Sequence, residues 1–236
     1  MHGPVKAGLF AIAAAAVFSV HAATSLFPMR VGDVWTYDAE VEWTLKGTNK
    51  TMNAKLPWTT KVVDAVEGPH GRAVVVRDFP FHLAWLDPAE PREPAFDVIV
   101  VRPEGLWIDT DTASHDDARE RAGRAAAGET VGNQVLQFPL REKACITSDD
   151  NADRPRNGSY CWYLSLQDSS ANARAWHLEY RTLPDHEFLD FIEGVGFTEY
   201  TYGHHGTVDE VHAVLRGKPW HDEAHDAAKV SVRRTP

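Results

Sequence analysis

Residues 35–45 read WTYDAEVEWTL, and this stretch decides the fold because its side chains alternate without exception. The odd positions carry aromatic or aliphatic residues, and the even positions carry Thr, Asp or Glu. Successive side chains of a β-strand point to opposite faces of the sheet. A strict period of two therefore predicts a long strand with one apolar face and one solvated face.

The pattern continues in a second stretch, after a turn. Residues 51–66 place Met52, Leu56 and Trp58 on one face and polar residues on the other, and GTNK at 47–50 supplies turn residues between the stretches. We expect 34–46 and 51–66 to form a long hairpin, with Pro57 at an edge or a bulge because proline cannot donate to a strand ladder. Alternation predicts further strands at 72–86, 95–101, 106–108, 160–167, 174–182, 187–193, 196–203 and 207–216.

Many strands joined by short turns indicate an antiparallel sheet, and its apolar face has to be covered. The chain offers at most one or two short helices, and the clearest candidate is 114–128, where Ser114 can cap the N-terminus of a helix. This segment is either a solvated surface helix or a mobile loop. We therefore predict a mainly β protein with one large antiparallel, strongly curved sheet that forms a half-barrel or a barrel. The concave side is expected to carry five tryptophans: Trp35, Trp43, Trp58, Trp85 and Trp176.

These tryptophans have two interpretations. They form a filled core, or they line an apolar cavity, because a barrel of about eight strands can hold a small ligand. The second interpretation makes a lipid or another apolar small molecule the expected partner.

Residues 1–22 have the features of an export signal. Lys6 precedes an apolar run from Ala7 to Val20, and Val20-His21-Ala22 matches the small-residue pattern of a cleavage site. The run is shorter than the roughly 20 residues that span a bilayer. We expect cleavage near Ala22, a periplasmic or secreted protein that does not span the membrane, a single antiparallel β domain over 23–217 and a polar tail over 218–236.

Composition excludes one class of partner. The 236 residues include 24 Lys and Arg against 34 Asp and Glu, which gives a net charge of −10. Such an acidic chain has no electrostatic footprint for nucleic acid. We expect a monomer, and no motif indicates a cofactor.

Three short motifs carry a resemblance to known proteins. Residues 32–37 (GDVWTY), 138–140 (FPL) and 194–197 (GVGF) resemble motifs of several uncharacterised exported bacterial β-domain families. The resemblance implies the curved-sheet architecture of periplasmic lipoprotein carriers and an exported location. It carries over no established activity.

Cys145 and Cys161 enclose a polar loop. In an exported protein, two cysteines at this spacing predict a disulfide that clamps the base of the loop. A redox role would more naturally use C-x-x-C, which is absent.

Histidines near the C-terminus are candidate metal ligands. His204 and His205 occupy a turn, and His212 lies on the following strand, so their imidazoles could gather a transition metal; the alternative is a hydrophilic turn with solvated histidines. Three functions stay open: a non-enzymatic binding or carrier module for an apolar or amphipathic ligand, which we favour, a structural or assembly component of the cell envelope, and a metal-dependent hydrolase that uses these histidines.

Overall fold

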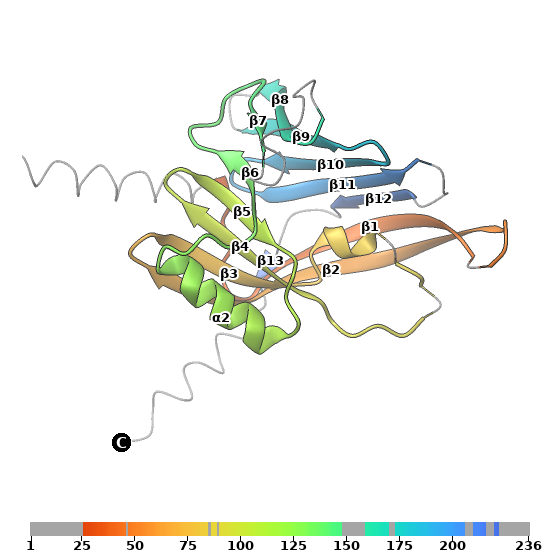
Figure 1. Cartoon of the computed structure of the whole chain (residues 1–236), viewed down its shortest axis with the longest axis horizontal. Helices are drawn as coiled ribbons and strands as arrows, with labels where there is room; N and C mark the ends of the chain where they lie inside the picture. The colour runs from red at the N-terminus through yellow and green to blue at the C-terminus, as the bar shows by residue number, and fades with distance from the viewer. Residues whose placement is uncertain are drawn as a thin grey trace, which may run out of the picture.

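The computed structural model confirms the predicted fold class: the protein is mainly β and is built on one strongly curled antiparallel sheet (Figure 1). It describes residues 26–45, 47–84, 86–88, 90–147, 159–169, 173–205, 210–215 and 220–221, the last two ranges for their backbone alone. The predicted signal peptide and its cleavage site lie outside these residues.

The described elements follow one another in this order: β1 (Asp33–Thr44), β2 (Thr51–Gly68), β3 (Gly71–Arg77), the 3-10 helix η1 (Pro80–Leu83), β4 (Phe96–Arg102), β5 (Gly105–Asp109), α2 (His115–Ala126), β6 (Asn133–Gln137), β7 (Cys145–Ile146), β8 (Trp162–Ser169), β9 (Arg174–Arg181), β10 (Asp185–Ile192), β11 (Gly196–His204), β12 (Glu210–Leu215) and β13 (Trp220–His221).

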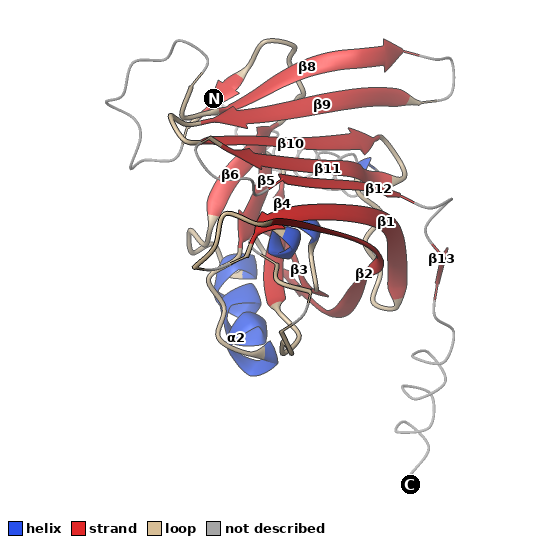
Figure 2. Cartoon of the chain, turned by 90° about the vertical axis from the view of Figure 1, so that its right-hand side faces the viewer, coloured by secondary structure: helices blue, strands red, loops and turns tan. Residues whose placement is uncertain are grey.

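Strand order explains the curl. Across the sheet the strands run β6-β5-β4-β3-β2-β1-β12-β11-β10-β9-β8-β7, and β13 pairs with the start of β1. The two edge strands, β6 and β7, are joined by a short segment and lie near each other. The sheet therefore curls until its ends approach, and forms a half-barrel with two arms: β3–β6 and β8–β11 (Figure 2).

The alternation of the first two strands fixes their register. Tyr37 pairs with Trp58 and Val41 with Ala54, so the apolar parities of β1 and β2 share one face, as predicted. Pro57 pairs with Asp38 in a part of β2 that extends beyond the end of β3, where a missing N–H interrupts no second ladder.

The concave side of the sheet holds the main core. Alternate residues of β3 and β4, such as Val74 and Ile99, face this core, while Val75 and Val98 face outward onto α2. Helix α2 begins at the predicted cap, where Ser114 Oγ accepts a hydrogen bond from Asp117 N. The segment 114–128 therefore forms a helix and not a loop. One face of this helix is covered by the sheet, where it buries a stripe of alanines.

The structure corrects the predicted strand at 72–86. Strand β3 ends at Arg77, Asp78 adopts a left-handed φ of 58°, and Pro80 begins η1, because proline is suited to the first turn of a helix. Short strands β6, β7 and β13 were not predicted; β13 lies within the range expected to be a polar tail.

No helix among the described residues is long and apolar enough to cross a membrane.

Candidate functional site

A cavity of about 670 Å³ lies between the two arms of the half-barrel. Strands β5 and β6 form one side of it, β8–β11 form the other, and η1 contributes a third wall. The residues that line it combine aromatic rings with carboxyl, amide and hydroxyl groups: Phe81, His82, Ala84, Ile108, Thr110, Asn133, Gln134, Val135, Trp162, Tyr180, Thr182, Asp185, Glu187 and Tyr202. Ligand sites in proteins commonly have this volume and this mixture.

Sheet register places four of these residues in one row. Trp162 of β8 pairs with Tyr180 of β9, Tyr180 pairs with Glu187 of β10, and Glu187 pairs with Tyr202 of β11. Directly paired residues of adjacent strands lie on the same face of a sheet. The wall of the cavity is therefore an aromatic row with one carboxyl group between two tyrosines.

Glu187 is the most perturbed carboxyl group in this wall. Burial raises its pKa from the usual 4.5 to about 7, although Tyr200 Oη donates a hydrogen bond to Oε1 at 2.9 Å; the nearby charge of Asp185 adds to the increase. The second oxygen, Oε2, accepts no hydrogen bond from any residue that the structure describes. Glu187 thus lines the cavity with one carboxyl oxygen available to a ligand.

Asp185 lies two residues away on the same face of β10 but has a different environment. Desolvation pushes its pKa upward, and hydrogen bonds from His204, Tyr202 and Thr182 outweigh that effect, so its pKa lies below the usual value. His204 Nδ1 lies 2.7 Å and Tyr202 Oη 2.9 Å from Oδ1, and Thr182 Oγ1 lies 3.1 Å from Oδ2. Both Asp185 oxygens are therefore occupied by the protein itself.

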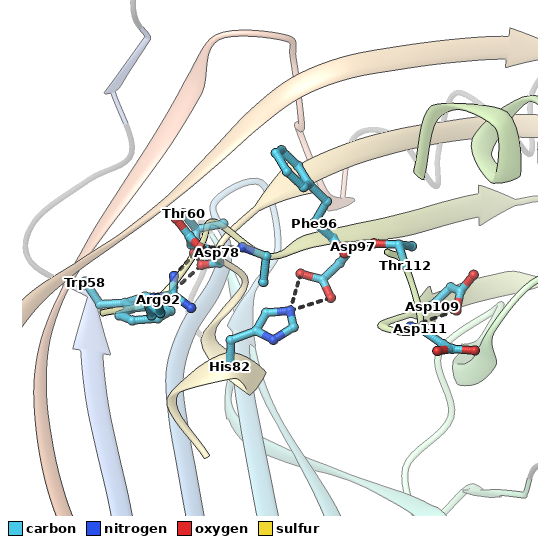
Figure 3. Close-up of polar contacts among 11 residues, drawn as sticks. Trp58, Thr60, Asp78, His82, Arg92, Phe96, Asp97, Asp109, Asp111 and Thr112 are labelled. Atoms are coloured by element: carbon cyan, nitrogen blue, oxygen red, sulfur yellow. Dashed lines mark hydrogen bonds and ion pairs between the residues drawn. The ribbon is translucent and has the colours of Figure 1, made fainter. Parts of the chain in front are cut away.

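The turn at Asp78 positions the η1 wall. The main-chain oxygen of Asp78 accepts hydrogen bonds from Trp58 Nε1 at 2.8 Å and Thr60 Oγ1 at 2.6 Å. Its carboxylate is bound by Arg92, whose guanidinium lies 4.3 Å from the centre of the Trp58 ring (Figure 3). These contacts fix the point at which the chain leaves β3 and folds η1 into the mouth of the half-barrel.

A second anchor holds His82, which follows Phe81 on η1. Asp97 of β4 is fully buried, and its carboxylate oxygens lie 2.8 and 2.9 Å from His82 Nε2 (Figure 3). Burial raises the pKa of Asp97, opposed by the hydrogen bonds from His82 and from the Phe79 main chain. The carboxylate fixes the orientation of a ring that lines the cavity.

Of the predicted ligand-binding tryptophans, the four that the structure describes do not line this cavity. Trp58 and Trp176 are buried, with their indole N–H groups bonded to Asp78 O at 2.8 Å and Glu193 Oε1 at 2.9 Å. Trp43 is half-buried, with a buried Nε1 that has no partner among the described residues, and Trp85 lies outside them. Of the tryptophans that the structure describes, Trp162 is the one in the cavity wall. A ligand role for the predicted five stays a prediction.

Trp35 has a particular place, because it joins two of the motifs that carried the family resemblance. Its Nε1 donates to Val195 O at 3.2 Å, and Tyr37 Oη donates to Phe197 O at 3.1 Å. Gly196 has a φ of 101°, and a Cβ built there would lie 3.4 Å from Trp35 Nε1. The GDVWTY and GVGF motifs therefore contact each other across the core.

The predicted metal ligands are not brought together in the described residues. His204 contacts Asp185, and His205 Nε2 lies 3.2 Å from Nε2 of His186, which sequence reasoning did not select. The side chain of His212 lies outside the described residues. No group of three or more His, Cys, Asp or Glu suited to a metal ion occurs among the side chains that the structure describes.

The predicted disulfide is confirmed. Cys145 and Cys161 are bonded, with their Cα atoms 5.4 Å apart. The bond ties β7 to the residue that precedes β8, next to Trp162 in the cavity wall.

Removing this bond has a measurable cost. We expect the Cys145→Ala/Cys161→Ala variant to lose about 3 kcal/mol of unfolding free energy, because the cross-link restricts the unfolded chain. Urea unfolding measures this difference. Reductant should lower the stability of the wild type to that of the variant and leave the variant unchanged; thiols that react with Ellman's reagent in unreduced, denatured wild type would contradict the bond.

A sequence signal for the site existed. On β10 the odd positions are Asp185, Glu187, Leu189 and Phe191, so two partly buried carboxylates share a parity with two buried apolar residues. Acidic residues on the apolar parity of a strand are unusual because burial penalises their charged form. The position of the opposite arm, which encloses them, depends on long-range pairing that this pattern does not reveal.

Comparisons with known proteins give little. No family model and no curated protein sequence matches this chain. The crystal structure of a Bacteroides fragilis NCTC 9343 protein, described as exported and as having a YmcC-like fold, is similar over 83% of this chain and 98% of that one, at 12% sequence identity and a TM-score of 0.40. A likeness of this size supports no inference, so the proposals below rest on the residues of this chain.

Proposed function

We propose that this protein is an exported binding module that holds a small amphipathic ligand in the cavity between the two arms of its half-barrel. The observation that carries the proposal is the cavity of about 670 Å³, whose lining combines aromatic rings with polar side chains. Export is supported by the sequence of residues 1–22, which has the order of a charged residue, an apolar run and a small-residue cleavage pattern.

The aromatic wall suits the apolar part of a ligand. The Phe81 and Trp162 rings are stacked with their centres 6.1 Å apart, and the Trp162 and Tyr180 ring centres are 5.2 Å apart. Aromatic side chains offer large apolar surfaces at low entropic cost, and Tyr adds a hydroxyl for orientation. Phe81 belongs to η1, whereas Trp162 and Tyr180 belong to β8 and β9. A ligand bound against these rings would therefore contact both η1 and the sheet.

Binding explains the carboxyl pair better than acid–base catalysis does. Two carboxyl groups whose pKa values are shifted in opposite directions are also a pattern of acid and base partners. Here the Asp185 oxygens both accept hydrogen bonds from protein groups, which leaves this carboxylate poorly placed to take a proton from a substrate. The geometry favours recognition over reaction.

A fluorescent probe tests the proposal. We expect N-phenyl-1-naphthylamine, an uncharged aromatic probe, to bind protein purified from the exported fraction with an increase in emission. Trp162→Leu should weaken this binding about tenfold, because it removes the central ring of the wall. Trp107→Leu is the matched control, since Trp107 packs with α2 on the outer side of the sheet.

The test has a clear negative result. Absence of probe binding by the wild type, or equal losses in the Trp162 and Trp107 variants, would refute the cavity as the binding site. Phe81→Leu provides a second wall variant if Trp162→Leu does not fold. Solvent extraction of the exported protein, followed by mass spectrometry, then identifies any compound that copurifies with it.

A further inference from the structure

The charges that face the cavity are unbalanced. Asp185 and Glu187 both line it, and none of the described lining residues is a lysine or an arginine. His82 is the basic residue of the lining, and its Nε2 is held by Asp97. Complementary charge is a main source of specificity in binding, so the lining favours a ligand with a positive group over one with a negative group.

The position of that positive group is given by the row across β8–β11. Glu187 pairs with Tyr180 on one side and with Tyr202 on the other, and Trp162 extends the row beyond Tyr180. Aromatic faces attract cations, most strongly where water is excluded. A carboxylate between two tyrosines therefore combines an ion pair with cation–π contacts in one place.

Glu187 is also the carboxyl group that still has an oxygen to offer. Asp185 is occupied by His204, Tyr202 and Thr182, whereas Glu187 accepts one hydrogen bond from the described residues, that of Tyr200. Glu187 is only partly exposed, so a ligand donor can satisfy its unoccupied oxygen in a partly desolvated place, where a hydrogen bond is stronger than in water. A cationic donor on the ligand would do so directly.

We propose that the cavity selects cationic amphiphiles, with an ammonium group held by Glu187 between Tyr180 and Tyr202 and with the apolar part against Phe81 and Trp162. This inference rests on the proposed binding function and adds the chemical class of the ligand.

Ionisation of Glu187 should accompany binding. Since burial holds the pKa of Glu187 at about 7, the group is only partly charged at neutral pH, and a bound cation stabilises the charged form. Affinity for a cation should therefore rise between pH 6 and pH 8. The other titratable groups around Glu187 are Asp185 on β10 with its partner His204 on β11, Tyr200 and Tyr202 on β11, Tyr180 on β9 and His82 on η1.

Three probes of equal chain length separate charge from apolar contact. Octylammonium, 1-octanol and octanoate are titrated into the exported protein at pH 8, below their aggregation concentrations, by calorimetry or by displacement of N-phenyl-1-naphthylamine. We expect octylammonium to bind about tenfold more tightly than 1-octanol, and octanoate to bind most weakly.

Two variants complete the test. Glu187→Gln should weaken octylammonium binding about tenfold and change 1-octanol binding by less than about threefold. Asp190→Asn is the matched control on the same strand, because Asp190 lies on the other face of β10 and contacts His177 at 2.5 Å.

The two proposals fail differently. Equal binding of octylammonium and 1-octanol, or no effect of Glu187→Gln on octylammonium, would overturn the cationic class and leave the binding function standing. Tighter binding of octanoate than octylammonium would do the same. If none of the three probes binds and N-phenyl-1-naphthylamine also fails, the binding function itself is wrong.

Discussion

Trp35→Ala should lower the free energy of unfolding by about 3–5 kcal/mol, the cost of truncating a large aromatic side chain in a well-packed core. Trp35 is 4% exposed, and its indole N–H donates to Val195 O at 3.2 Å. The substitution removes the ring. It also removes the one hydrogen bond that this ring makes, among the described residues, to the segment before β11. Urea unfolding followed by circular dichroism gives the difference.

Trp35→Phe is the matched variant. It keeps an aromatic ring but removes the N–H donor and part of the ring volume, so that Val195 O loses a partner and a small cavity remains, and we expect a smaller loss of about 1–3 kcal/mol. Because Trp35 lies outside the lining of the cavity, the same variant should bind 1-octanol like the wild type. A loss below about 1 kcal/mol for Trp35→Ala would show that this ring is loosely packed, as expected of a ligand wall and not of a core.

Local alternation was enough to predict the first hairpin. The strict period of β1 specifies which side chains are buried, and a slip of one residue against β2 would place Tyr37 and Val41 on the wrong face. The observed pairs Tyr37–Trp58 and Val41–Ala54 follow from that requirement. The export context together with the spacing of Cys145 and Cys161 was likewise enough to predict their bond.

The helix η1 is an element that the local pattern of apolar residues does not predict. Phe79, Phe81 and Leu83 have the parity that predicts a strand, yet the chain turns at Asp78 and presents these side chains to the core from η1 and the residue before it. What stabilises the turn is distant in sequence: Trp58 and Thr60 on β2, and Arg92 in the following loop. The hydrophobic pattern of a segment does not predict contacts with residues that are so far away in the sequence.

The cavity could not be predicted from the sequence alone, because its position depends on how the two arms of the sheet approach each other. Alternation places Trp162 and Tyr180 on an inward face, and it places Asp185 and Glu187 there as well. That these side chains face β5, β6 and η1 across a cavity depends on the approach of the two arms. Alternation also predicts the five tryptophans on the concave side, whereas the acidic residues that interrupt the apolar parity of β10 mark the wall of this cavity.

Glu187→Gln should make the protein more stable at pH 8, by on the order of 3 kcal/mol, and leave its stability at pH 4.5 nearly unchanged. Burial raises the pKa of Glu187 from 4.5 to about 7, so the folded protein binds this proton more tightly than the unfolded chain does. The stability from this group is thus fully present below about pH 4.5 and is lost as pH rises through about 7. Glutamine is neutral at every pH, has nearly the same shape and can still accept the hydrogen bond from Tyr200 Oη.

The measurement is urea unfolding of both proteins at several pH values from 4.5 to 8. Glu40→Gln is the control, because Glu40 is an exposed carboxylate on β1 that pairs with Lys55, and exposed pairs contribute about 0–1 kcal/mol. Other groups also titrate in this range, since the pKa of His177 is raised by its hydrogen bond to Asp190 and the pKa of Asp97 is raised by burial. The difference between wild type and Glu187→Gln cancels these shared contributions. If the two stability curves run parallel, Glu187 ionises in the folded protein without a free-energy cost, and the cavity wall is more hydrated than its packing indicates. If the curves diverge as pH rises, the ionised Glu187 destabilises the folded protein, and a bound cation would offset this cost.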